Sequence, residues 1–204
     1  MGYNQAMDTT RDLEEEFERI ARGHRDAHRA RAARSVLGPS VVRVFAAGTK
    51  PGLQARLEQI PVDDLKTIVD AEGFRVWYEK QLQSVAIEIR KRNATRARIL
   101  PGIKWGHSGK VLSLFLRDLV EHCRYFTDAE SGRIVPWLHV PVDSLVMKRL
   151  KRCGVALPVQ QIKKIATAKQ FYAIQDCLEE AAQRAGIPRV WFDDNWAKRV
   201  DEKE

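Results

Sequence analysis

Two residues near the middle of the chain have side chains that could act together chemically, and each stands where a helix is expected to begin. Lys110 follows a glycine-rich turn, Ile99-Leu100-Pro101-Gly102-Ile103-Lys104-Trp105-Gly106-His107-Ser108-Gly109. Asp143 ends the segment His139-Val140-Pro141-Val142 and precedes a further helical pattern. A lysine amine becomes a nucleophile when it loses its proton, and a carboxylate beside it can stabilise a developing cation.

The turn before Lys110 has the composition of a phosphate-binding site. Its proline and three glycines oppose regular structure and allow close approach of the backbone. A turn that leads into the apolar helical run 111–116 presents free N–H groups at the positive end of a helix, where a phosphate can bind. Taken alone, an ordinary corner between two helices explains these residues equally well. Asp143 taken alone is explained as a helix N-cap.

Together, the two segments resemble the helix-hairpin-helix DNA glycosylase superfamily, which carries a Leu-Pro-Gly-Val/Ile hairpin, a lysine on the next helix and a downstream Val-Asp. The matching residues are Leu100-Pro101-Gly102-Ile103, then Lys110, then Val140-Pro141-Val142-Asp143. Lys104 stands where a second glycine is usual, and 33 residues separate Lys110 from Asp143, which is longer than in most members. Both departures, and the tail 186–196, are similar to the archaeal 8-oxoguanine glycosylase branch.

The resemblance implies an all-α fold with two lobes, forming a single domain over residues 1–204, in which a flipped base enters a cleft. It implies that Lys110 attacks the sugar C1′ with Asp143 assisting, and that an AP lyase step can accompany excision. Oxidised guanine is the implied substrate. The divergent hairpin leaves room for another modified base, including the bulky modified pyrimidines of bacteriophage DNA, which would make the protein a defence enzyme.

The same argument assigns residues to DNA and to the base. The predicted DNA contacts are Arg96, Arg98, Gly102, Lys104, Gly106, His107 and Gly109. The predicted base-pocket residues are Trp137, His139, Trp191 and Trp196, although such side chains are more often part of the core of a helical protein. Two other functions stay open. One is a non-catalytic helix-hairpin-helix DNA-binding module, and the other is an RNA-binding accessory protein, which leaves the Val-Pro-Val-Asp segment unexplained.

The composition favours a polyanionic partner. The 204 residues are 44% hydrophobic, with a net charge of +8 and a pI near 9.6, and the cationic excess is mostly arginine. The cysteines Cys123, Cys153 and Cys177 are widely spaced and predict reduced thiols, and they cannot build the four-cysteine iron–sulfur loop of some glycosylases. With no membrane-spanning run and no signal peptide, we expect a cytoplasmic monomer that acts on double-stranded DNA without a metal or cofactor.

Hydrophobic periodicity predicts eight to ten helices and no clear strand. Residues 9–36 form a long polar helix in which acidic residues precede arginines, an order that suits the helix dipole. Its narrow apolar stripe is Leu13, Phe17, Ile20 and Ala21, which leaves Arg22, Arg25, Arg29, Arg31 and Arg34 facing outward. Residues 72–92 form an amphipathic helix with Phe74, Trp77, Tyr78, Leu82, Val85 and Ile89 inward. Residues 124–138 are expected to form a loop, and further helices are expected at 147–152, 158–167 and 169–184.

Overall fold

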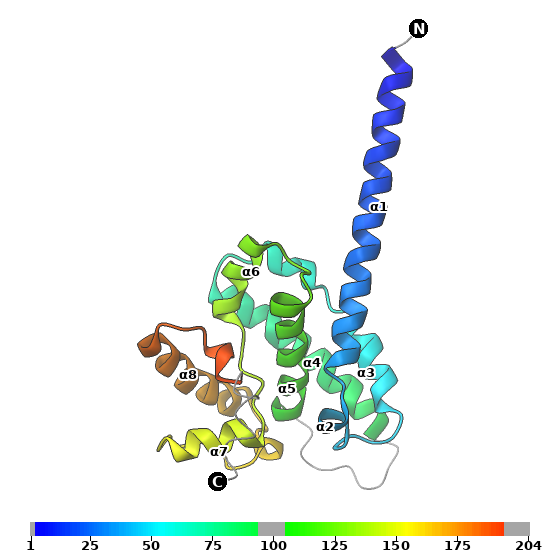
Figure 1. Cartoon of the computed structure of the whole chain (residues 1–204). Helices are drawn as coiled ribbons and strands as arrows, with labels where there is room; N and C mark the ends of the chain where they lie inside the picture. Colours follow the sequence, from blue (N-terminus) through cyan, green and yellow to red (C-terminus); the bar gives the residue numbers. More distant parts are fainter. Residues whose placement is uncertain (1–2, 94–104, 194–204) are drawn as a thin grey trace, which may run out of the picture.

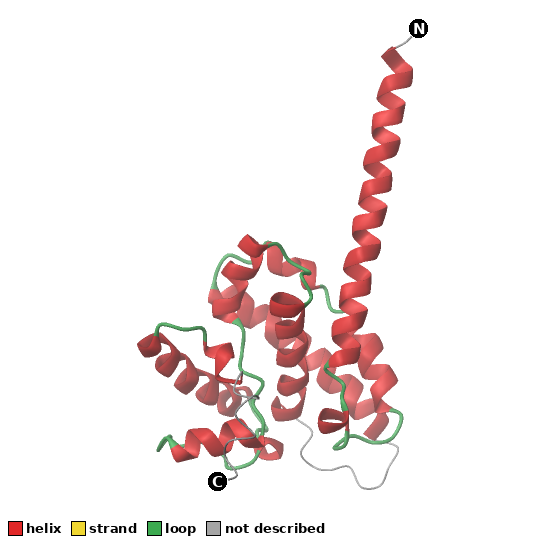
Figure 2. Ribbon diagram, in the orientation of Figure 1, coloured by secondary structure: helices red, strands yellow, loops and turns green. Residues whose placement is uncertain are grey.

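The computed structural model describes residues 3–93 and 105–193, and every regular element in these two ranges is a helix (Figures 1 and 2). The expected all-α class is therefore confirmed for the described part of the chain. The α-helices are α1 (Tyr3–Ser35), α2 (Pro39–Val42), α3 (Thr49–Glu58), α4 (Ala71–Asn93), α5 (Trp105–Arg117), α6 (Asp128–Ile134), α7 (Ser144–Arg152) and α8 (Ala168–Ala185). The shorter elements are η1 (Val62–Lys66), η2 (Asp118–His122), η3 (Val135–Trp137), η4 (Ile162–Lys164) and η5 (Arg189–Asp193).

Helices α4 and α5 supply the middle of the hydrophobic core. The predicted inward face of α4 is confirmed, because its six apolar residues from Phe74 to Ile89 are all buried. On α5, Val111, Leu112, Phe115 and Leu116 are buried as well. In Figure 1, α1, α2 and α3 lie on one side of α5, while α7 and α8 lie on the other. One connected core cluster extends from the end of α1 to η5.

Helix α1 is anchored to the rest of the described protein near its C-terminal end. The guanidinium of Arg29 donates to the Tyr125 hydroxyl at 2.6 Å and to the Glu58 carbonyl at 3.2 Å. The Ser35 hydroxyl donates to Asp118 at 2.6 Å. The prediction that Arg29 faces outward is therefore wrong, because this side chain is 19% exposed and binds the body of the protein.

The segment 124–138 is not the loop that was predicted. Thr127 caps α6 through a capping box, in which its hydroxyl accepts from the Glu130 N–H and the Glu130 carboxylate accepts from the Thr127 N–H. The sequence pattern Thr-x-x-Glu is the signal that identifies this helix start. Helix α5 reaches this segment through one turn of π-helix, η2, in which the Cys123 N–H donates to the Asp118 carbonyl.

The helix predicted at 158–167 is also wrong, since only the three residues of η4 are helical there. The Ile165 carbonyl accepts from the Gly106 N–H of α5 at 3.1 Å, so this segment is held by a tertiary hydrogen bond to the first turn of α5. No helix in the described residues is long and apolar enough to cross a lipid bilayer.

Candidate active site

Lys110 and Asp143 lie in contact. The Lys110 Nζ is 3.3 Å from the Asp143 Oδ2, and the two side chains are only 17% and 12% exposed. Lys110 is the sixth residue of α5, and Asp143 is the N-cap of α7, so the second turn of α5 meets the start of α7. The predicted turn before Lys110 is wrong over residues 105–109, which already belong to α5. The expectation that these residues face each other across 33 positions is confirmed.

The path of the chain explains why this separation is compatible with contact. Figure 1 shows the chain running away from the site through α5, turning at α6, and returning beside α5 to the start of α7. The return segment, residues 138–143, is extended and largely buried, and Pro141 keeps Val140 out of the helical region. The 33 residues between Lys110 and Asp143 therefore run outward along α5, turn through α6, and return as an extended segment.

The Asp143 carboxylate has two separate roles. Its Oδ1 accepts hydrogen bonds from the Leu145 and Val146 N–H groups at 2.8 and 3.0 Å, which caps α7. Its Oδ2 faces the Lys110 amine. The cap fixes the rotamer of the side chain and places the second oxygen where it can accept a proton from Lys110. A helix cap and a charge partner are therefore combined in one residue.

Gln175 holds the backbone that delivers Asp143. Its side-chain amide donates to the Val140 carbonyl and accepts from the Val140 N–H, both at 2.9 Å, and Gln175 is fully buried. These two bonds satisfy a buried, non-helical peptide that would otherwise lack partners. Gln175 lies on α8, and nothing in the sequence around it signalled this role.

Arg189 fixes the beginning of the same return segment. Its guanidinium donates to the Leu138 carbonyl at 2.9 Å and to the Trp137 carbonyl at 2.8 Å, and it forms an ion pair with Glu179 at 3.3 Å. Burial lowers the pKa of Arg189, and Glu179 opposes this shift. The segment 137–143 is therefore tied to α8 and η5 before it reaches Lys110.

The helix that carries Lys110 is fixed by Tyr78. The Tyr78 hydroxyl donates to the Gly109 carbonyl at 3.1 Å and lies 2.8 Å from the Ser113 hydroxyl. Burial raises the pKa of the Tyr78 phenol, so the group stays protonated and remains a donor. The sequence pattern predicts that Tyr78 is a core residue, but it does not indicate the hydrogen bond from Tyr78 to Gly109, the residue before Lys110.

His139 is part of the core and does not line an open base pocket. Its ring is 4% exposed and is enclosed by Phe74, Tyr78, Phe171 and Tyr172, with ring centroids 4.5–5.6 Å away. Neither ring nitrogen has a hydrogen-bond partner among the described residues. Burial, together with Arg189 and Arg75, holds the pKa of His139 well below its usual value, so the imidazole is neutral.

Trp137 packs against the core, and Trp191 lies at the far end of α5 from the lysine–aspartate pair. Trp137 packs on the core against Phe74, with ring centroids 6.3 Å apart. The Trp191 indole donates to Glu121 at 2.8 Å. Glu121 follows Lys110 by eleven residues of helix, a separation of roughly 16 Å along the axis. Trp191 is therefore too far from Lys110 to contact a base whose sugar the lysine reaches.

Two of the predicted phosphate-binding glycines have packing roles instead. The Gly106 N–H is already bonded to Ile165, and a side-chain carbon at position 106 would collide with the Ile162 carbonyl. A side-chain carbon at Gly109 would lie 2.7 Å from the Phe171 ring. Both glycines are therefore explained by the close approach of other segments to the first turns of α5. The backbone N–H of Gly106, which was expected to be free for a phosphate, is already used in a hydrogen bond.

Of the remaining predicted contacts, His107 is described by the structure and the others are not. His107 is half-buried on the first turn of α5 and lies edge-to-face with Phe45, with ring centroids 6.2 Å apart. Because His107 and Lys110 are three residues apart on one helix, both belong to the same face. Four predicted DNA contacts, Arg96, Arg98, Gly102 and Lys104, and the base-pocket candidate Trp196 lie outside the described residues.

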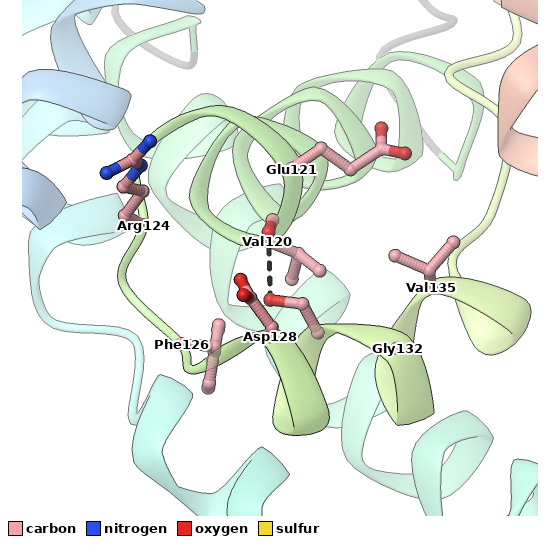
Figure 3. Close-up of a pocket in the computed structure, with 8 residues that line it drawn as sticks. Val120, Glu121, Arg124, Phe126, Asp128, Gly132 and Val135 are labelled. Atoms are coloured by element: carbon pink, nitrogen blue, oxygen red, sulfur yellow. Dashed lines mark hydrogen bonds between the residues drawn. The ribbon is translucent and has the colours of Figure 1, made fainter.

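A surface pocket of about 360 Å³ lies at the opposite end of α5 (Figure 3). It lies between η2 and α6, and Glu121, Arg124 and Asp128 are among its lining residues. One wall is fixed by the Ser131 hydroxyl, which donates to the Val120 carbonyl at 3.1 Å. Val120 follows Lys110 by ten helical residues, so this pocket is separate from the lysine–aspartate pair.

Comparison of the chain with protein-family models, with curated proteins and with solved structures found no match.

Proposed function

We propose that the protein is a DNA glycosylase of the helix-hairpin-helix type, in which Lys110 is the nucleophile and Asp143 assists it. The observation that carries this proposal is the nearly buried contact between the Lys110 amine and the Asp143 carboxylate. The helix-hairpin-helix resemblance of the surrounding sequence and the net charge of +8 add support. The two-lobed arrangement and the cleft for the flipped base belong to the same proposal.

The chemistry follows from the two groups. Lys110 passes a proton to Asp143, and its lone pair then attacks C1′ of the nucleotide. The bond from C1′ to the base nitrogen breaks, and the base leaves with the bonding electrons and takes up a proton from solvent. Opening of the sugar ring leaves an imine between Lys110 and C1′, which water hydrolyses or a lyase step resolves. After it accepts the Lys110 proton, Asp143 releases this proton to solvent, and its restored charge stabilises the cationic sugar while the glycosidic bond lengthens.

Burial of the pair favours catalysis over simple phosphate binding. A lysine that only grips DNA works best with its amine in solvent, and it needs no carboxylate beside it. Removing two charges from water is unfavourable, so a buried pair adds little to stability by itself. A catalytic role gives a reason for this arrangement. The packing roles of Gly106 and Gly109 also remove part of the support for a purely phosphate-binding hairpin.

The substrate proposed is double-stranded DNA with a modified base, either oxidised guanine or a bulky modified pyrimidine of bacteriophage DNA. Base release should be measured on a panel of duplexes that carry these bases. The matched variants are Lys110→Gln and Lys148→Gln, since Lys148 is exposed on α7. We expect release from one class of duplex by the wild type and by Lys148→Gln, and none by Lys110→Gln, with DNA affinity retained.

The non-catalytic DNA-binding module gives a different result in the same experiment. It predicts that every duplex is bound with similar affinity, that no base is released, and that both lysine variants behave alike. Release that persists in Lys110→Gln would instead show that another residue performs the chemistry.

A further inference from the structure

The first half of α1 carries an apolar stripe that the described protein leaves uncovered. Leu13, Phe17 and Ile20 are 56%, 69% and 52% exposed. Every residue from 12 to 24 is exposed, and in Figure 1 this part of α1 projects away from the other helices. The spacing of four and then three residues continues to His24 and Ala27. Such a spacing places side chains on one seam and is typical of a coiled coil.

The charges of α1 are separated along its length. Residues 12–18 hold five carboxylates and no cation, whereas residues 19–34 hold six arginines and one carboxylate. Two such helices in parallel would place like charges side by side. Two helices in antiparallel orientation would place the acidic segment of each beside the basic segment of the other. The charge pattern therefore favours a second α1 helix as the partner and an antiparallel orientation of the two helices.

We propose that two copies of this chain associate through antiparallel pairing of their α1 helices. When Phe17 of one copy faces Ile20 of the second copy, Leu13 falls opposite His24. In the same alignment, Asp12 is level with Arg25, and Glu15 is level with Arg22. The seam buries the three exposed apolar side chains, and the helices extend away from the lysine–aspartate pair, which stays accessible in both copies.

A second copy fits this surface better than nucleic acid or an anionic membrane does. The five carboxylates at 12–18 would be repelled by phosphate groups in either case. Neither partner would match the alternation of an acidic and a basic segment around a narrow apolar seam. Because this seam is short, we expect a dissociation constant on the order of 1–100 µM. This dimer replaces the monomer expected from the sequence.

Sedimentation velocity of the full chain over a range of concentrations tests the proposal. The wild type should change from monomer to dimer across the micromolar range. The double variant Phe17→Glu/Ile20→Glu should raise the dissociation constant by about 100-fold or more, because two apolar side chains no longer enter the seam. The matched control is Val76→Glu/Ile87→Glu, which changes two exposed apolar residues of α4 and should leave the dimer intact.

Charge-reversed variants test the orientation. Glu14→Lys/Glu15→Lys/Glu16→Lys makes the centre of the acidic segment basic, and Arg19→Glu/Arg22→Glu/Arg25→Glu makes the facing part of the basic segment acidic. Each variant alone should remain a monomer, while an equimolar mixture should form a heterodimer. The wild-type dimer should also weaken as salt rises, because ion pairs across the seam are screened. Circular dichroism of the variants checks that the helical body is still folded.

Three results would overturn the proposal. The first is a wild type that stays monomeric at every concentration, whether or not a different protein binds α1. The second is a dimer that survives Phe17→Glu/Ile20→Glu, which would place the interface elsewhere. The third is a dimer that is indifferent to both charge reversals, which would remove the argument for antiparallel pairing. None of these results depends on the proposed glycosylase activity.

Discussion

At the scale of single residues, Asp143 is both a helix N-cap and a charge partner of Lys110, which the sequence left as alternatives. One carboxylate oxygen caps α7, and the other contacts the Lys110 amine. The two functions are linked, because a side chain held by two backbone N–H groups cannot rotate away from the lysine without breaking the cap. A substitution that keeps one oxygen and replaces the other can therefore test the helix cap and the proposed catalytic role separately.

Asp143→Asn makes this separation. Its amide oxygen can keep the cap, while its NH₂ group replaces the charged oxygen beside Lys110. We expect base excision to fall by about 10²–10³-fold or more, because the charge that meets the developing cation is lost. Single-turnover base release measures the rate. Asp143→Ala is the control for the cap and should lower the free energy of unfolding by about 1 kcal/mol more than Asn does. An Asn variant with the wild-type rate would leave Asp143 as a cap alone.

His139 predicts a pH dependence of stability. Its pKa is lowered in the folded protein, so below about pH 6.5 the unfolded chain binds the proton more readily. The His139 contribution is fully present above that pH and is lost as the pH falls toward the folded pKa. The slope is about 1.4 kcal/mol per pH unit. Urea unfolding of the wild type and His139→Leu at pH 5, 6 and 7 should show a steeper loss in the wild type. Parallel curves would contradict this origin.

At the scale of elements, the position of Asp143 depends on a segment with no regular structure of its own. Residues 138–143 are held by side chains from α8 and η5, chiefly Gln175 and Arg189. Loops that carry catalytic groups need such support, because a small displacement of the reacting groups lowers the rate. The bonds to Val140 come from a residue 35 positions away, so sequence spacing alone could not reveal them.

Gln175→Leu tests this support with a side chain of similar size. The variant leaves the Val140 N–H and carbonyl buried without partners, which should lower the free energy of unfolding by about 2–4 kcal/mol. Gln183→Leu on the same helix is the matched control, since Gln183 is exposed and should change stability by less than about 0.5 kcal/mol. Chemical denaturation measures both. Equal effects of the two variants would mean that the Val140 contacts contribute little.

Gly106→Ala tests the packing role of the first turn of α5, before Lys110. The new methyl group meets the Ile162 carbonyl, so we expect a loss of about 1–3 kcal/mol. Gly132→Ala in α6 is the control, because nothing lies within 4 Å of the added carbon, and it should be stabilising by up to about 1 kcal/mol. Thermal unfolding of the two variants compares them. A stable Gly106→Ala variant would favour the phosphate-binding role that the sequence first suggested.

At the scale of the whole molecule, the sequence could predict what depends on local pattern. The amphipathic face of α4, the long polar helix α1 and the meeting of Lys110 with Asp143 were all foreseen. Tertiary effects were not. The segment at 158–167 gives its Ile165 carbonyl to α5 in place of forming a helix, and His139 was drawn into a core of aromatic rings. Such outcomes depend on which surfaces pack together in the folded protein, and local sequence patterns do not contain this information.

The residues that carry the two proposals lie in different parts of the structure. The lysine–aspartate pair lies at the second turn of α5 and the N-cap of α7, within the helical body. The apolar stripe of α1 lies on a helix that projects from that body (Figure 1). We therefore expect that substitutions can remove the proposed base excision and the proposed dimerisation independently. A variant that loses one and keeps the other is the expected outcome in each direction.

The central claim is that Lys110 forms a covalent bond to C1′ of a nucleotide. The most direct measurement is borohydride reduction of the protein during its reaction with modified duplex DNA, followed by digestion and mass spectrometry of the crosslinked peptide. We expect a single adduct on Lys110, absent from Lys110→Gln and strongly reduced in Asp143→Asn. An adduct on a different amine, or base release with no adduct at all, would contradict it.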